Sequence, residues 1–185
     1  LGRDQMARYA AICDHAICDS DFNKAELDAL GYRSTDTVPV LFDISDATAD
    51  KSTLTRLRRS RRGTQVLFVG RIAPNKGHHD LVAAVRTLRD LYQDDAHLHI
   101  VGTDGPPGYR RVVDTIVAHA GMRDHVTFHG SVTQEELVAH YQAADVFCCL
   151  SDHEGFCVPI IEAMHHGLPV VAYDCTAIGA TVDGG

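Results

Sequence analysis

Two glutamates eight residues apart, Glu154 and Glu162, are suited by type and spacing to bind a polyol. The run 145–150 before them is mostly apolar, which is typical of a buried parallel strand. Pro159 suits the first position of a helix, where its missing N–H is not needed. Glu154 is therefore expected in the loop after a strand and Glu162 in the first turns of the helix, where carboxylates can accept hydrogen bonds from sugar hydroxyls.

The residues between the two glutamates predict an anion site. At the start of a helix the backbone N–H groups have no partner within the helix, and the helix dipole adds positive charge. We expect these amides to bind a phosphate group. They belong to Gly155, Phe156, Cys157 and Val158.

Three segments together resemble one protein family. Residues 154–163 (EGFCVPIIEA) are similar to the EGFxxPxxEA signature of retaining GT-B glycosyltransferases, in the large fourth family (group 1 glycosyl transferases) that uses nucleotide-sugar donors. Residues 69–77 (VGRIAPNKG) resemble that family's VGRxxxxKG phosphate-binding segment, and residues 128–132 (FHGSV) resemble the segment beside the nucleotide base. The three motifs stand in the family's order, so the resemblance is specific.

The resemblance implies a role for each matching residue. Glu162 would accept hydrogen bonds from both ribose hydroxyls, and Glu154 would contact the donor sugar. Arg71 and Lys76 would neutralise the charge that develops on the diphosphate as the sugar bond breaks. The implied catalytic residues are Glu154, Arg71 and Lys76; the implied donor-binding residues are Gly70, Arg71, Lys76, Val132, Glu154, Gly155, Phe156, Cys157, Val158 and Glu162.

Each of these residues also has a purely structural interpretation. Arg71 and Lys76 could be solvated loop charges, and Gly70 could serve only to form a turn. Glu162 could be a glutamate favoured by the helix dipole, and Glu154 the last residue of a Ser151-x-x-Glu154 cap.

Composition narrows the class of protein. The chain has 185 residues, 45% of them hydrophobic and 23% charged, as in an ordinary soluble domain. A net charge of -8 argues against nucleic-acid binding, which depends on neutralising phosphates. No run approaches the roughly 18–20 apolar residues of a membrane span, and no signal peptide opens the chain, so we expect a cytoplasmic protein.

No metal site or cofactor is predicted. The six cysteines form no CxxC pair and are expected to be reduced thiols. Among the twelve histidines, the pairs at 78–79 and 165–166 diverge on helices, and His97 and His99 share a strand face without an obvious third ligand.

Strands and helices alternate regularly from residue 64. Apolar runs predict five strands, and periodic segments between them predict four helices, so the fold class is α/β with a doubly wound parallel sheet, Rossmann-like as in the C-terminal domain of a GT-B fold. The expected strands are 65–69, 98–101, 126–128, 146–150 and 170–173; the expected helices are 77–92, 109–120, one opened by a Thr133/Glu136 capping box, and the helix of Glu162.

The chain is expected to be a truncated fragment with three parts. Residues 1–45 are interpreted as the tail of an N-terminal acceptor domain, with a last strand at 37–42. Residues 46–63 are interpreted as an interdomain linker, and 64–185 as a nucleotide-sugar-binding domain incomplete at its C-terminus. Apolar residues of 1–45 that would pack on the rest of the N-terminal domain predict dimerisation or disorder there.

The predicted function follows from the resemblance. It implies an enzyme of glycan biosynthesis that moves a hexose from a nucleotide-diphosphate sugar to a glycan or lipid-linked acceptor with retention, the present chain being the donor-binding half and inactive alone. The arginines at 56, 58, 59, 61 and 62 could be a solvated face or could contact a phosphorylated acceptor or a membrane surface. The alternatives are a GT-B phosphorylase or epimerase, and a non-catalytic flavodoxin-like binding domain.

Overall fold

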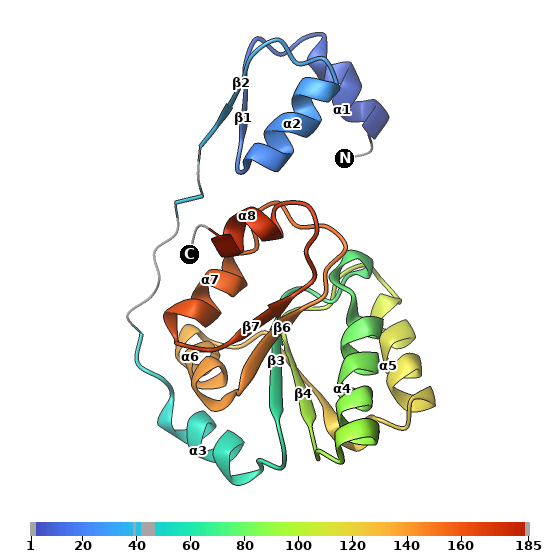
Figure 1. The fold of residues 1–185 in the computed structure, drawn as a ribbon, viewed down its shortest axis with the longest axis vertical. Helices are drawn as coiled ribbons and strands as arrows, with labels where there is room; N and C mark the ends of the chain where they lie inside the picture. Colours follow the sequence, from blue (N-terminus) through green and yellow to red (C-terminus); the bar gives the residue numbers. More distant parts are fainter. Residues whose placement is uncertain (1–2, 39, 42–46, 184–185) are drawn as a thin grey trace.

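The computed structural model describes residues 3–38, 40–41 and 47–183. Figure 1 shows a small N-terminal unit above a larger unit that contains the main sheet. The larger unit carries the three sequence motifs, and its topology determines where they meet.

The N-terminal unit has two short parallel strands, β1 (Ala16–Cys18) and β2 (Thr35–Thr37), with helices α1 (Arg3–Ala10) and α2 (Asp21–Ala29). Ser20 caps α2, its hydroxyl accepting the N–H of Asn23 at 3.3 Å. The predicted strand at 37–42 starts two residues too late, because β2 is the polar run Thr35–Thr37 and not the more apolar run that follows it. Among the described residues, the last backbone bond to β1 runs from Val38 N to Cys18 O; residues 39 and 42 lie outside the described residues.

The main sheet is entirely parallel, with strand order β5-β4-β3-β6-β7. The chain runs outward from the central strand through β4 to β5, then returns to the other side of β3 for β6 and β7. This order confirms the predicted doubly wound fold. It reverses between β3 and β6, and sheets of this kind bind ligands at the carboxyl ends of the strands beside such a reversal. The strands are β3 (Gln65–Val69), β4 (His97–Val101), β5 (Val126–Gly130), β6 (Val146–Cys149) and β7 (Val170–Ala172).

Helices cover both faces of this sheet, because alternate strand residues point to opposite sides. Phe68 and its neighbours pack under α4 and α5, whereas Leu67 and Phe147 pack under α6, α7 and α8. The helices are α4 (His78–Tyr92), α5 (Tyr109–His119), α6 (Gln134–Ala143), α7 (Val158–His165) and α8 (Ile178–Asp183), with 3-10 turns at Pro74–Lys76 and Arg123–His125. The predicted Thr133/Glu136 capping box at the start of α6 is confirmed.

The segment interpreted as a linker contains one helix, α3 (Lys51–Arg59), which packs against α6. Asp50 N donates to Glu135 O at 2.9 Å, Leu57 is buried, and Arg61 pairs with Asp145 at the start of β6. These contacts attach α3 to the sheet unit. In the described part of the chain, no helix is long and apolar enough to cross a membrane.

Candidate functional site

The loops that follow β3 and β6 lie against each other at the point where the strand order reverses. Asp152 N donates to Asn75 O at 2.9 Å, and Asn75 Nδ2 donates to His153 O at 3.2 Å. Gly77, with φ 61°, lies so close to Leu150 that a Cβ would stand 1.9 Å from its carbonyl oxygen. The VGRxxxxKG and EGFxxPxxEA segments therefore form one continuous site.

An ion pair joins the two segments. Lys76 Nζ lies 2.7 Å from Glu154 Oε1 and 2.8 Å from Oε2. The Glu154 side chain is 9% exposed and that of Lys76 is 20% exposed, so solvent screens the pair little. The ammonium can offer its third N–H to a ligand while it neutralises the carboxylate. The interpretation of Glu154 as the last residue of a Ser151-x-x-Glu154 cap is wrong, because Cys157 is the residue that precedes α7 and no side chain caps that helix.

The start of α7 presents unpaired amides. Cys157 adopts a left-handed conformation (φ 65°), which turns the chain into the helix, and Pro159 occupies its first turn. Within the described part of the chain, the N–H groups of Gly155, Cys157 and Val158 donate to no other residue. Together with the helix dipole, they form an electropositive cradle suited to phosphate.

Two threonines hold this loop in place, and the sequence analysis assigned neither of them a role. The Thr176 hydroxyl donates to Glu154 O at 2.8 Å and accepts the Glu154 N–H at 2.9 Å. Thr181, in α8, donates to Phe156 O at 2.5 Å. Hydrogen bonds from a short side chain to a distant backbone leave no periodic signal in a sequence, so only the structure could reveal these contacts.

Glu162 points to α6. Its Oε2 accepts the Tyr141 hydroxyl at 2.8 Å. Burial raises the pKa of Tyr141, and the charge and hydrogen bond of Glu162 raise it further, so the hydroxyl stays protonated and donates. The bond restricts the rotation of the carboxylate and leaves Oε1 for another donor.

The remaining predicted residues lie around this centre. Gly70 N continues the sheet pairing by donating to Val101 O at 2.9 Å. Val132 is half-buried against the core beneath α6. Arg71 is exposed, and no ion pair ties it to another described residue. The structure thus brings Lys76, Glu154 and the α7 amides together, whereas it leaves Arg71 at the surface.

Two thiols lie beneath the loop. Cys149 Sγ and Cys157 Sγ are 3.8 Å apart, and all six cysteines are free. Hydrogen bonding from the Cys157 thiol lowers the pKa of Cys149 and raises that of Cys157. Cys149, Glu154 and Cys157 also place three metal-binding atoms within 4.8 Å of one another, although the Lys76 ammonium bonds the same carboxylate.

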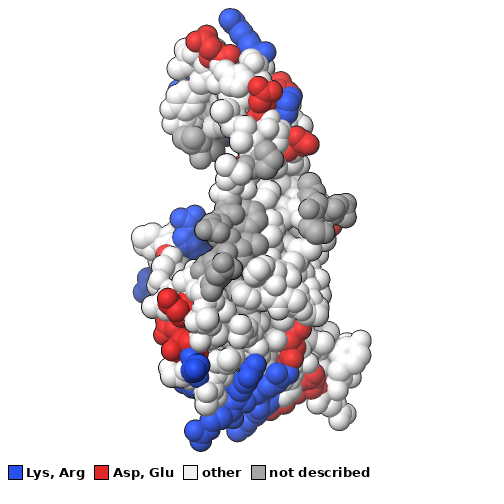
Figure 2. All heavy atoms as spheres, turned by 90° about the vertical axis from the view of Figure 1, so that its left-hand side faces the viewer, with Lys and Arg blue, Asp and Glu red and all other residues white. Residues whose placement is uncertain are grey.

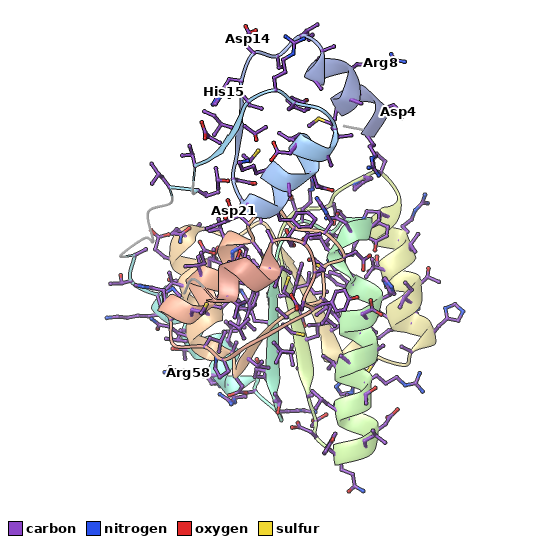
Figure 3. All side chains as sticks on the ribbon, turned by 45° about the horizontal axis from the view of Figure 1, so that its top comes forward. Asp4, Arg8, Asp14, His15, Asp21 and Arg58 are labelled. Atoms are coloured by element: carbon purple, nitrogen blue, oxygen red, sulfur yellow. The ribbon has the colours of Figure 1, made fainter. Side chains whose placement is uncertain are left out.

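The N-terminal unit reaches the edge of the site. A Cβ on Gly155 would stand 2.8 Å from Asp19 Oδ2, and the Phe22 and His153 rings are 6.3 Å apart. A cavity of about 730 Å³ lies between this unit and His153, lined by Arg3, Met6, Ile17, Asn23 and Leu27 among others. In Figures 1 and 3 the start of α2, marked by Asp21, faces the larger unit.

Comparison with known proteins places the chain in a family. The sequence profile for "Glycosyl transferases group 1" matches residues 55–183. The chain is 37% identical to the 2-deoxystreptamine glucosyltransferase of Streptomyces kanamyceticus over 163 residues, which cover 85% of this chain and 41% of that protein. It is 39% identical over 124 residues to a GDP-mannose-dependent alpha-(1-6)-phosphatidylinositol monomannoside mannosyltransferase of Mycobacterium tuberculosis, covering 63% of this chain and 31% of that protein. The chain thus spans less than half the length of these curated relatives.

Solved structures share the fold. The Anabaena protein HepE, in complex with UDP and glucose, matches with a TM-score of 0.82 and 21% identity, over 97% of this chain and 51% of that one. The C-terminal domain of a group 1 glycosyl transferase from Francisella tularensis matches with a TM-score of 0.61 and 23% identity, over 75% and 73% of the two chains. By its sequence profile, the chain belongs to the group 1 family of glycosyl transferases.

Proposed function

We propose that this chain is the donor-binding half of a retaining glycosyltransferase, which moves a hexose from a nucleotide-diphosphate sugar to a glycan or lipid-linked acceptor. The observation that carries the proposal is the meeting of Lys76, Glu154 and the α7 amides at the reversal of strand order. A diphosphate there would face an ammonium group and several N–H donors, and a sugar would face Glu154.

The chemistry required is departure of a nucleoside diphosphate, on which negative charge develops. Lys76, fixed by Glu154, is positioned to stabilise that charge without moving, and preorganised groups of this kind are the most effective. Arg71 is exposed and can turn toward the outer phosphate. Because protein groups supply the positive charge, donor binding should need neither a metal ion nor a cofactor.

Glu162 is assigned to the ribose. Its Oε1 is left available by the Tyr141 bond, and a carboxylate can accept from the 2′ and 3′ hydroxyls together. The similarity to a glucosyltransferase and to a GDP-mannose-dependent mannosyltransferase supports a hexose donor, and the second of these acts on a phosphatidylinositol monomannoside. Retention is proposed from the resemblance of residues 154–163 to the retaining signature.

The experiment is calorimetry of the chain with UDP, GDP and ADP, each in the presence of EDTA. We expect one of the three to bind equally well with and without the chelator. Binding that requires Mg²⁺ or Mn²⁺ would overturn the metal-free assignment. Preference for inorganic phosphate over every nucleotide would favour the phosphorylase alternative, and binding of none of these ligands would favour the non-catalytic one.

The variant Arg71→Gln tests whether Arg71 binds the phosphate groups of the ligand. Loss of a charge-assisted hydrogen bond costs about 1.5–3 kcal/mol, or roughly 10- to 150-fold in affinity for the diphosphate, while the matching nucleoside should bind as before. Arg58→Gln is the matched control, because Arg58 is in the last turn of α3, which leads to the start of β3, whereas the loops of the candidate site follow the ends of β3 and β6 (Figure 3). Equal losses for diphosphate and nucleoside would show that Arg71 does not hold phosphate.

The basic face of α3 is the surface that we assign to the acceptor side. Figure 2 shows Lys and Arg side chains gathered at the end of the molecule where α3 lies, and Arg56, Arg58 and Arg59 are in its last turn. In a cytoplasmic enzyme this face would suit an anionic membrane surface that carries a lipid-linked acceptor. Sedimentation with anionic and neutral vesicles tests this, and equal binding to both would remove the assignment.

A further inference from the structure

Four histidines occupy a face of the sheet where apolar side chains would be expected. His97 and His99 on β4 and His129 on β5 point to the side opposite Leu98 and Phe128, and His140 approaches them from α6. His140 is only 3% exposed. Burying an imidazole ring costs free energy unless its nitrogens are bonded, so a cluster of four histidines on this face needs a physical explanation.

The hydrogen bonds around His99 fix its tautomer. Gln65 Nε2 donates to the carbonyls of Arg62 and Gly63 at 2.6 and 3.0 Å, which turns Gln65 Oε1 toward His99 Nε2 at 3.0 Å. His99 must therefore carry its proton on Nε2, and the lone pair of Nδ1 faces His129 Nε2 at 2.9 Å. A polar acceptor that bonds the N–H of one ring nitrogen, and so fixes the tautomer and the direction of the other nitrogen, is the usual outer contact of a metal-bound histidine.

We propose that His99, His129 and His140 form a binding site for one divalent transition-metal ion of the zinc class. One ring nitrogen from each of the three comes within 4.8 Å of the other two. Neutral imidazoles are ligands for Zn²⁺, Co²⁺, Ni²⁺ and Cu²⁺ alike. The site lies on the α3 and α6 side of the sheet, away from the donor loops, and does not depend on the proposed function. It departs from our expectation that His97 and His99 lack further ligands, because β5 and α6 supply them.

The geometry needs only a small adjustment. Two nitrogens of a tetrahedral zinc site, each about 2.0–2.1 Å from the metal, stand about 3.3 Å apart, so His99 and His129 would separate by a few tenths of an ångström. The His129 proton would move to its other nitrogen, and no proton need be released. A cavity of about 10 Å³ borders His99 and His140, which is near the size of one water and leaves room for a fourth ligand.

The protonation state of the three histidines also suits metal binding. Burial lowers the pKa of His99 and His129 to about 3 and that of His140 to about 4, so all three are unprotonated at neutral pH. Arg56 is the cation that contributes to each of these shifts, and as an exposed side chain of α3 it can turn toward solvent. A bound ion would connect β4, β5 and α6, and would stabilise the layer against which α3 packs.

The test is zinc titration of the untagged chain after treatment with EDTA and dialysis. We expect one Zn²⁺ per chain by calorimetry, and a Co²⁺ complex with the visible bands of a tetrahedral site but without thiolate charge-transfer absorption. His129→Gln and His99→Gln should each weaken binding at least tenfold. His97→Gln is the matched control: the ring centroid of His97 lies 4.7 Å from that of His99, but His97 bonds Thr127, so this variant should bind zinc as the parent does.

Two further variants keep the result interpretable if a ligand substitution unfolds the chain. Gln65→Met leaves all three histidines in place and should weaken zinc 10- to 100-fold while one ion still binds. Cys149→Ala disrupts the other candidate group and should change nothing. The proposal is overturned if no zinc binds, if Cys149→Ala abolishes binding, or if Gln65→Met and His129→Gln both leave the affinity unchanged.

Discussion

The N-terminal unit and the sheet unit of this chain differ in how much of their apolar surface they bury. In α1, β1, α2 and β2 the buried side chains are Ala10 and Cys18, while Ile12 is 74% and Ile17 67% exposed. In the sheet unit, Leu67, Phe147 and Ile160 are fully buried beneath α6 and α7. The candidate site therefore rests on a well-packed layer, whereas the small unit has little core of its own.

The sheet unit thus contains both the packed core and the candidate site. A site that binds by preorganised charge needs elements that do not move. Both loops of the candidate site follow interior strands of the sheet, β3 and β6. The N-terminal unit borders the cavity beside His153.

The largest expected difference is in core packing. Phe147→Ala should lower the free energy of unfolding by about 3–5 kcal/mol, because it leaves a cavity between β6 and α7. Ile17→Ala, in β1, should change it by no more than about 0.5 kcal/mol. Urea unfolding followed by circular dichroism measures both. Similar losses for the two variants would show that β1 is packed in solution and would remove the contrast.

The dependence of stability on pH should separate the two units in the same way. Burial lowers the pKa of His78 to about 4 from 6.5, and its ring packs on Phe68 and Tyr109. Between these values the unfolded chain binds a proton that the folded chain does not, so stability falls as pH decreases from 6.5 to 4. His78 alone accounts for about 3 kcal/mol of that loss.

His78→Phe should therefore reduce the acid sensitivity of the sheet unit, measured as the urea midpoint at pH 7 and pH 4.5. Ile17→Ala is the control in the other unit, since it removes no titratable group and should leave the pH dependence unchanged. An unaltered dependence in His78→Phe would mean that His78 is protonated without cost.

The smallest effect concerns self-association. Ile12 and Ile17 leave apolar surface open on the N-terminal unit, and such patches favour contact with a second copy. We expect weak dimerisation at high protein concentration that Ile17→Ser reduces and Val112→Ser, an exposed position on α5, does not. A chain that stays monomeric throughout sedimentation analysis would reject dimerisation through residues 1–45.

Much of the sheet unit could be predicted because its local signals agree. Each strand from 65 to 173 is an apolar or alternating run between turn residues, and the Thr133/Glu136 box marked the start of α6 correctly. The motifs also singled out Lys76 and Glu154, which the structure brings into contact. Helix α8 was missed, because a segment with Gly179, Thr181 and Val182 has weak helix propensity and forms through burial of Ile178 and the Thr181 bond.

Contacts between distant segments could not be predicted. Nothing in the sequence indicates that Lys76 forms an ion pair with Glu154 or that Thr176 bonds the Glu154 backbone. The hydrogen bond from Tyr141 to one oxygen of Glu162 is equally without a sequence signal. These depend on the reversal of strand order, which brings residues 78 positions apart into contact. The histidine cluster was hidden for the same reason, since its members come from β4, β5 and α6.

The ribose assignment of Glu162 tests the central claim most directly. In Glu162→Gln, the Tyr141 hydroxyl will select the amide oxygen, which turns the NH₂ group toward the ribose and replaces an acceptor by a donor. The measurement is the affinity of the nucleoside diphosphate that binds and of its 2′-deoxy form, for the parent chain and the variant.

In the parent chain, the 2′-deoxy form should bind about 5- to 150-fold more weakly, which corresponds to about 1–3 kcal/mol for an unsatisfied acceptor. In Glu162→Gln, the ribonucleotide should weaken and the ribo-to-deoxy preference should shrink toward one. This result would confirm that Glu162 binds the ribose of the donor at this site. A variant that binds more weakly but keeps the full preference would show that Glu162 supports the fold and does not contact the ribose.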